Sequence, residues 1–222
     1  LLEKRRRVCR PHDNDLPRRT KKQIIMCAVI GYTGEYNQAL IGRLLDNSKI
    51  RGIHSFGYSF YCDGTVVTKK FLDFEEFQES IESDKPRKFI AHFRYSTSGD
   101  FKDQENNQPL QAGNVAIAFN GVISQKSKVE IELEYDTELL GDNDGYLLLE
   151  KYTDQTFIRK PAITFAAVGL KDGKVFALRN SKRPLWYAET SGAKIYASTR
   201  DILNRSGIQD CYKIESIKIH EQ

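Results

Sequence analysis

Hydrophobic residues occur along this chain in short runs whose spacing changes from that of strands to that of helices. The first run, CAVIGYT at 27–33, is almost wholly apolar, and a run of that kind predicts a buried strand. The apolar residues between Leu40 and Leu45 then repeat at helical spacing, which predicts a helix over about 35–48. The pattern therefore predicts a folded part that opens with a strand and a helix.

A hairpin and a second helix are predicted next. Residues 56–62 and 65–71 have the composition of strands, and they flank an Asp-Gly pair, which favours a tight turn. Apolar residues then share one face of 74–83, and Asp73 with Glu76 resembles a capping box at its start. We therefore expect a β-hairpin followed by a capped helix.

The rest of the chain is dominated by short strands. We expect strands at 87–95 and 114–120, a helix at 144–152, strands at 162–170, 174–180, 184–190 and 193–199, a helix at about 200–206, and a last strand near 211–219. Turn residues separate the four strands between 162 and 199, which predicts a β-meander. Many strands with a few helices, not strictly alternating, favour an α+β fold with packed antiparallel sheets.

Composition indicates the cellular compartment and argues against membrane, metal and cofactor sites. The chain has 222 residues, 40% hydrophobic and 29% charged, which is typical of one soluble globular core. No apolar run reaches the roughly 18 residues of a membrane span, so we expect no membrane partner. The four cysteines form no CxxC pair and the four histidines lie at no metal-ligand spacing, so we expect no metal, no cofactor and a reducing, cytoplasmic location.

The positive charge lies at the N-terminus. Residues 1–26 hold nine Lys or Arg residues against three acids, whereas residues 27–222 hold 25 basic and 27 acidic residues. We interpret 1–26 as a basic leader, propeptide or disordered tail and 27–222 as the folded domain. Only this tail has the excess positive charge to bind nucleic acid. It lacks the interleaved aromatic residues typical of such binding, so we do not expect nucleic acid to be the main partner.

Cys27 is the most informative residue, because it follows Met26, the only methionine. The chain begins with Leu1, so we expect Met26 to be the start and its removal to leave Cys27 first. A terminal amine with a pKa near 8 can then take the proton of the thiol. A nucleophile and its base on one residue indicate an amide-cleaving enzyme.

Six further patterns follow the one that begins with Cys27, in one order, and strengthen this interpretation. The seven patterns are CAVIGYTG (27–34), RGIHSFG (51–57), AHFRYSTSG (91–99), NQPL (107–110), AFNGVIS (118–124), DNDGYLLL (142–149) and the pair RNSKRPLWY/YASTRDIL (179–187, 196–203). Together they resemble the glutaminase domain of class II glutamine amidotransferases, a branch of the N-terminal-nucleophile hydrolases. The resemblance covers about 27–205 and implies a four-layer αββα sandwich of two mainly antiparallel sheets.

The resemblance also implies roles for individual residues. Cys27 would attack the side-chain amide of L-glutamine, giving a γ-glutamyl thioester and ammonia. Asn120, through its side chain, and Gly121, through its backbone N–H, would stabilise the oxyanion. Arg94 would bind the substrate α-carboxylate, in a pocket lined by the backbone of Thr97, Ser98 and Gly99.

Three assignments depend on finer points. The acid that binds the substrate ammonium is assigned to Asp144, because its separation along the sequence from Asn120 fits the family. Asp136 is the alternative. The family usually has Ser/Thr-Glu after this acid, and the chain has Gly-Tyr there. Arg51 would pack beside Cys27, in a structural or a catalytic role, and His92 is expected to be a satisfied core histidine.

The function expected from this resemblance is hydrolysis of glutamine to glutamate and ammonia, with the ammonia supplied to a separate synthase subunit. No nucleotide-binding loop or second catalytic domain is present in the sequence. One alternative is a non-catalytic regulatory or binding module on the same fold, whose basic tail contacts nucleic acid or a partner. Another is an N-terminal-nucleophile amidase acting on a different amide.

Overall fold

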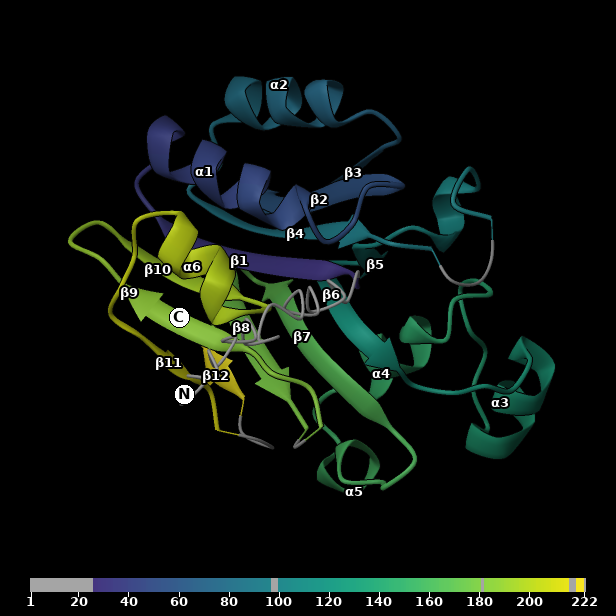
Figure 1. Cartoon of the computed structure of the whole chain (residues 1–222). Coiled ribbons are helices and arrows are strands. Elements are labelled where there is room, and N and C mark those ends of the chain that lie inside the picture. The colour runs from purple at the N-terminus through teal and green to yellow at the C-terminus, as the bar shows by residue number, and fades with distance from the viewer. Residues whose placement is uncertain (1–25, 97–99, 181, 216–218, 222) are drawn as a thin grey trace, which may run out of the picture.

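Two antiparallel sheets lie face to face, and helices cover both outer faces (Figure 1). The computed structural model describes residues 26–96, 100–180, 182–215 and 219–221. The seven-stranded sheet has the order β11-β9-β10-β1-β4-β2-β3, formed by β1 (Ala28–Gly34), β2 (Ser55–Cys62), β3 (Thr65–Phe71), β4 (Lys88–Arg94), β9 (Trp186–Glu189), β10 (Ala193–Ala197) and β11 (Cys211–Lys213). The five-stranded sheet has the order β12-β8-β7-β6-β5, formed by β5 (Leu110–Ala112), β6 (Val115–Val122), β7 (Thr164–Lys171), β8 (Lys174–Arg179) and β12 (His220–Glu221).

Three apolar layers hold these elements together. The first lies between the seven-stranded sheet and α1 (Gln38–Lys49), α2 (Phe74–Asp84) and α6 (Arg200–Arg205). The second lies between the five-stranded sheet and α3 (Lys128–Tyr135), α4 (Gly145–Lys151) and α5 (Gln155–Ile158). The third lies between the two sheets. The predicted αββα sandwich is therefore confirmed.

Local sequence accounts for the hairpin and for the start of α2. Asp63 and Gly64 both have positive φ values, 49° and 85°, which suit the turn that joins twisted strands. Asp73 accepts hydrogen bonds from the backbone N–H groups of Glu75 and Glu76 and so caps α2, as expected. Both predictions from short-range patterns are confirmed.

The predicted β-meander between 162 and 199 is wrong. Strands β7 and β8 pair with each other in the five-stranded sheet, but β9 and β10 belong to the other sheet, where β10 pairs with β1. The chain therefore passes from one sheet to the other between β8 and β9. Each strand is buried on both faces of its sheet, so its local pattern does not specify its neighbour.

Helix α3 was absent from the sequence-based prediction, although Ser127 and Glu130 form a capping box at its start. One residue of this helix, Ile131, is buried, while Val129 and Leu133 are exposed. A helix without a continuous apolar face gives no helical periodicity to detect. The short elements β5, α5 and a 3₁₀ helix, η1 (Gln104–Asn106), were missed for lack of length.

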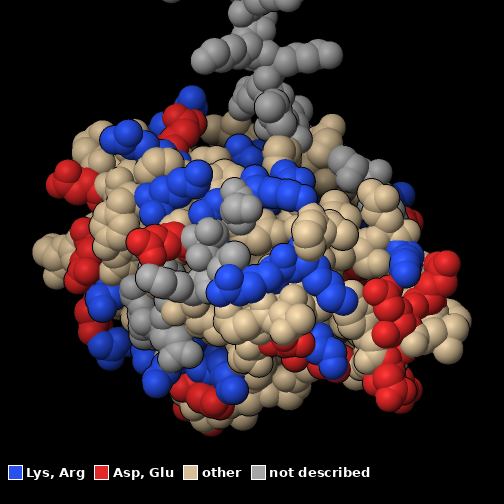
Figure 2. Space-filling view, turned by 90° about the horizontal axis from the view of Figure 1, so that it is seen from below, with Lys and Arg blue, Asp and Glu red and all other residues tan. Residues whose placement is uncertain are grey.

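The outer surface carries both signs of charge. Viewed from below, Lys and Arg side chains extend across the middle of one face, and Asp and Glu lie mostly around its rim, with a large group at the right (Figure 2). Among the described residues, none of the helices combines the length and apolar character needed to cross a membrane. The predicted leader lies, apart from Met26, outside the described residues.

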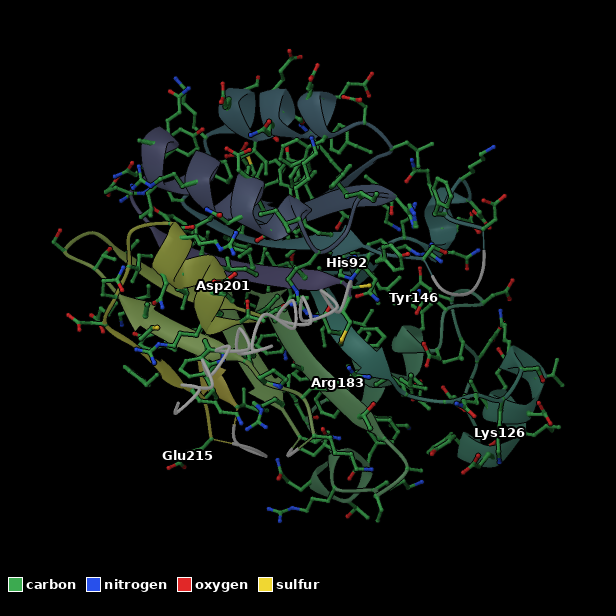
Figure 3. All side chains as sticks on the ribbon, viewed as in Figure 1. His92, Lys126, Tyr146, Arg183, Asp201 and Glu215 are labelled. Atoms are coloured by element: carbon green, nitrogen blue, oxygen red, sulfur yellow. The ribbon has the colours of Figure 1, made fainter. Side chains whose placement is uncertain are left out.

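His92 lies inside the molecule, between the two sheets, at the end where α4 and Tyr146 also lie (Figure 3). It is a core residue, as expected, but neither ring nitrogen has a hydrogen-bond partner among the described residues, so it is not satisfied. Burial lowers the pKa of His92 to about 3, and the positive charge of Arg94 acts in the same direction. The backbone of Phe119 opposes this shift, although it is not in hydrogen-bond geometry.

We expect His92 to make the fold sensitive to mild acid. The unfolded chain protonates this side chain below a pKa of about 6.5, whereas the folded chain does not until about pH 3, so stability falls as the pH drops through this window. Between pH 8 and pH 5 the contribution is about 2 kcal/mol, at 1.4 kcal/mol per pH unit. Urea unfolding at both pH values measures the free energy of unfolding. Between pH 8 and pH 5 this free energy should fall by about 2 kcal/mol less in His92→Leu than in the wild type. An equal loss in both proteins would contradict this assignment.

Candidate active site

The candidate residues meet because strand alternation continues beyond the apolar layer between the sheets. The side chains of Val29, Ile90, Ala118 and Tyr196 all belong to that layer. Every second residue of a strand faces the same side. The same side of the sheets therefore carries Cys27 just before β1, Arg94 at the end of β4, Asn120 near the end of β6 and Ser198 just after β10. Polar groups therefore replace apolar ones at one end of the sandwich.

The thiol of Cys27 lies against the end of β4. The N–H of Tyr95 donates to Sγ at 3.3 Å, and Sγ lies 3.6 Å from the carbonyl oxygen of Tyr95. The register Ala28↔Phe93, continued by one residue, places Cys27 beside Arg94. On the other side, Nε of Arg51 lies 3.4 Å from the carbonyl oxygen of Cys27. Arg51 thus contacts the nucleophile candidate, as expected.

Burial and charge act in opposite directions on this thiol. Burial raises the pKa of Cys27, because a thiolate loses hydration in a dry site. The N–H of Tyr95 and the positive charges of Arg94 and Arg51 oppose that rise. Burial is the larger of these influences, and the donor and the two cations favour the thiolate.

Arg94 is held in place by a loop that the sequence analysis left without a role. Its Nη1 donates to Oδ1 of Asn107 at 2.5 Å and to the carbonyl oxygen of Asn106 at 3.3 Å. Asn107 is fully buried and in turn donates to the carbonyl oxygen of Phe101 at 2.7 Å. Asn107 opens the NQPL pattern, so a signal for this function was present in the sequence.

Asn120 lies at the end of β6 and reaches across to the other sheet. Its Nδ2 donates to Oγ of Ser198 at 2.7 Å, and Ser198 also accepts the N–H of Val29 at 2.7 Å. Gly121 follows with φ of 154°, and a Cβ there would lie 1.8 Å from the carbonyl oxygen of Thr164. Only glycine fits this position.

Asp144 lies beside the segment that follows Asn120. Its Oδ2 accepts the N–H groups of Ile123 at 2.8 Å and Ser124 at 2.9 Å. Burial raises the pKa of Asp144, while these two hydrogen bonds oppose the rise. A carboxylate has capacity for more donors than two, so this side chain can also bind a cation.

The departure from the family pattern at Gly145 has a steric reason. A Cβ at Gly145 would lie 2.2 Å from the ring of Phe119 and 2.7 Å from Leu110. Helix α4 therefore packs closer to the sheet than a Ser or Thr would allow.

The alternative acid lies elsewhere. Asp136 ends α3 in the left-handed conformation, with φ of 48°, and its side chain is exposed. The geometry thus brings Asp144, and not Asp136, to the Asn120 segment. The predicted pocket residues Thr97, Ser98 and Gly99 lie outside the described residues.

His54 is a further residue that the sequence did not single out. Its ring stacks on Tyr95 and Phe101, with centroid separations of 4.8 and 5.0 Å. Its Nδ1 accepts the N–H of Ser96 at 2.8 Å. His54 therefore holds residues on both sides of 97–99, and no local pattern reveals a contact made between such distant segments.

No group of three or more His, Cys, Asp or Glu residues is suitably placed for a metal ion within the ranges that the structure describes. The groups that lie near this end of the sandwich are the Cys27 thiol, the Arg94 guanidinium, the Asn120 amide and the Asp144 carboxylate.

Comparisons with known proteins bear on the fold. No model of a known protein family matches the sequence, and no curated protein sequence matches it. Solved structures do match. A glutamine phosphoribosylpyrophosphate amidotransferase from B. subtilis, complexed with ADP and GMP, has a TM-score of 0.65 and 18% identity over 88% of this chain. An allosteric regulatory enzyme of purine biosynthesis has a TM-score of 0.68 and 18% identity over 88% of this chain.

A third match is a glutamine aminotransferase class-II domain protein from Silicibacter pomeroyi, with a TM-score of 0.53 and 13% identity. It is aligned over 88% of this chain and 98% of its own length. This chain spans about half the length of the first two proteins, 49% and 48%. At these identities the likeness shows the fold, and the resemblance noted in the sequence is thereby confirmed at the level of the fold.

We expect the charge of Arg94 to control the reactivity of Cys27. Replacing it in Arg94→Gln removes a cation that lowers the thiol pKa, so iodoacetamide should alkylate Cys27 severalfold more slowly at pH 8. Mass spectrometry of the Cys27 peptide measures the rate, and the exposed Cys62 provides an internal control whose rate should not change. Arg205→Gln, at an exposed ion pair on α6, is the matched control variant. An unchanged rate at Cys27 would contradict the electrostatic assignment.

Proposed function

We propose that this chain, which has the fold of class II glutamine amidotransferase domains, hydrolyses L-glutamine to glutamate and ammonia through Cys27. The observation that carries the proposal is the meeting of four groups at one end of the sandwich. The Cys27 thiol, the Arg94 guanidinium, the Asn120 amide and the Asp144 carboxylate come from four segments far apart in the chain.

The reaction begins at the thiol. With its α-amine free, Cys27 passes the thiol proton to that amine, directly or through a water molecule, and the thiolate attacks the side-chain carbonyl carbon of glutamine. The ammonium so formed then gives its proton to the departing nitrogen, and ammonia leaves a γ-glutamyl thioester. Water adds to the thioester carbon, glutamate is released and the thiol is restored. The proposal therefore requires that residues 1–26 be absent from the active protein.

Charge complementarity supports glutamine as the substrate. The guanidinium of Arg94 can form two parallel hydrogen bonds with an α-carboxylate. The carboxylate of Asp144 can accept the α-ammonium in a fixed position, because two backbone donors already orient its Oδ2. A substrate held by both of its α-groups would present its side-chain amide, at the other end of the molecule, to Cys27 in a fixed orientation, which lowers the entropic part of the barrier.

The tetrahedral intermediate needs donors for its oxyanion. Asn120 and Gly121 are proposed to supply them, through the side-chain amide and the backbone N–H. Donors fixed in a dry site stabilise developing charge more than water does, since they need no reorganisation during the reaction. The absence of a Cβ at Gly121 lets this backbone segment lie close to Thr164.

The ammonia is proposed to serve a separate synthase. The first two solved structures extend well beyond the part that this chain matches. The acceptor chemistry is proposed to reside in that synthase. The identity of the acceptor follows from that synthase and not from the residues described above.

The central test is turnover of glutamine. The full chain is purified with a protease site placed directly before Cys27, cut, and assayed for glutamate and ammonia. We expect turnover only after cutting, and Cys27→Ala should lower kcat by at least about a thousandfold because it removes the nucleophile. The affinity label 6-diazo-5-oxonorleucine should add to the Cys27 peptide of the cut protein.

Cys62→Ala is the matched control and should keep full activity, since Cys62 is exposed on the β2–β3 hairpin. Most of the activity remaining in Cys27→Ala would refute the nucleophile. Release of ammonia from another amide, without release from glutamine, would favour a different amidase.

The choice between the two acids gives a second test. Asp144→Asn keeps an oxygen for the backbone donors but removes the charge, so the KM for glutamine should rise about 30-fold, the effect of losing roughly 2 kcal/mol from a buried charge pair. Asp136→Asn is the matched control and should leave KM unchanged. Asp144→Asn should also discriminate less between glutamine and its analogue without the α-amine. If Asp136→Asn raised KM instead, the ammonium site would be at the end of α3.

A further inference from the structure

Ser198 lies where the two sheets and the nucleophile segment meet. Its hydroxyl is buried at the end of β10 in the seven-stranded sheet. Oγ accepts the N–H of Val29, two residues after Cys27, at 2.7 Å. The same atom lies 2.7 Å from Nδ2 of Asn120, which belongs to the five-stranded sheet. One hydroxyl therefore connects the strand that carries the nucleophile to the amide proposed to bind the oxyanion.

The amide of Asn120 is only half satisfied in this arrangement. Its Oδ1 is buried and has no hydrogen-bond partner within the described part of the chain. Oγ of Ser198 accepts two hydrogen bonds. Its own proton can be donated to the carbonyl oxygen of Val29, which lies 3.4 Å from Oγ, a long distance for a hydrogen bond. A buried acceptor without a partner is unfavourable, so this orientation of the amide is poorly stabilised at rest.

Rotation of the amide by half a turn resolves both deficits. The oxygen and nitrogen of an asparagine amide occupy nearly the same volume, so the exchange needs no movement of neighbouring atoms. Oδ1 would then accept the hydroxyl proton of Ser198, which keeps the N–H of Val29 as its donor. Both N–H groups of Asn120 would be free to bind an oxygen that carries negative charge.

We propose that Ser198 is the positioning residue that sets the amide of Asn120 with its N–H groups toward the substrate oxygen. The inference rests on the proposed glutaminase function and adds a residue to its machinery. Ser198 does not touch the substrate. It acts through Asn120, donating to Oδ1 and so determining which end of the amide is presented.

A double-mutant cycle tests this. In the cut chain, Ser198→Ala should lower kcat about tenfold or more, because an oxyanion donor is misdirected, and should change the KM for glutamine less than about twofold. In an Asn120→Ala background, Ser198→Ala should lower kcat by less than about twofold, since the group through which Ser198 acts is already absent. Equal losses in both backgrounds would overturn the inference.

Ser59→Ala is the matched control. Ser59 is also a buried serine of the seven-stranded sheet, and its hydroxyl bonds to Thr68 at 2.7 Å. This variant should keep kcat within about twofold, in line with a hydrogen bond that does not act on the reaction. Should Ser198→Ala fail to fold, Ser198→Cys replaces it, because the thiol is a weak donor of similar shape.

A spectroscopic measurement separates this inference from the proposed function. In the uncut chain labelled with ¹⁵N-asparagine, the side-chain NH₂ resonances of Asn120 are identified by their loss in Asn120→Asp. Ser198→Ala should shift these resonances and speed their exchange with water, whereas Ser59→Ala should not. Unchanged resonances in Ser198→Ala would refute the contact. Absence of glutamine turnover in the cut wild type, with the resonances shifted as expected, would count against the proposed function alone.

Discussion

Packing of the two sheets against each other is the interaction on which the remaining structure depends. The layer between them combines small residues, such as Ala116, Ala118 and Ala166, with branched ones, such as Val168 and Leu170. Small and large side chains can interdigitate across two faces about 10 Å apart, which closes the layer to water. Since each sheet buries its inner face in this way, its outer face needs helices to cover it, and the four-layer arrangement follows.

The candidate site is the place where this dry layer ends. The rows that carry Val29, Ala118 and Tyr196 continue to Cys27, Asn120 and Ser198 without a change of direction. A polar group in such surroundings is costly unless it has partners, and those partners also fix its position. The same principle applies to Arg94, which donates to Asn107, and to Asp144, which accepts two backbone N–H groups. Stability and orientation come from the same contacts.

The electrostatics of the site reflect a balance between burial and cations. Burial favours the neutral thiol of Cys27, while Arg94 and Arg51 favour its thiolate. The same burial lowers the pKa values of the two arginine side chains, whose proximity to the thiolate opposes that change. His92, more deeply buried and near Arg94, remains neutral. A strong gradient in burial over a few residues thus assigns different charge states to neighbouring groups.

The sequence by itself determined most elements of the fold, because turns and caps are encoded over short stretches. Its resemblance to a known family singled out Cys27, Arg94 and the Asn120-Gly121 pair as candidates. The sequence pattern placed β9 and β10 in the wrong sheet, and it missed the contacts of Asn107, His54 and Ser198. Only the tertiary structure decided which strands pair and which polar groups meet. The physical reason is that those hydrogen bonds join segments up to 169 residues apart, and the local pattern of either segment is compatible with several partners.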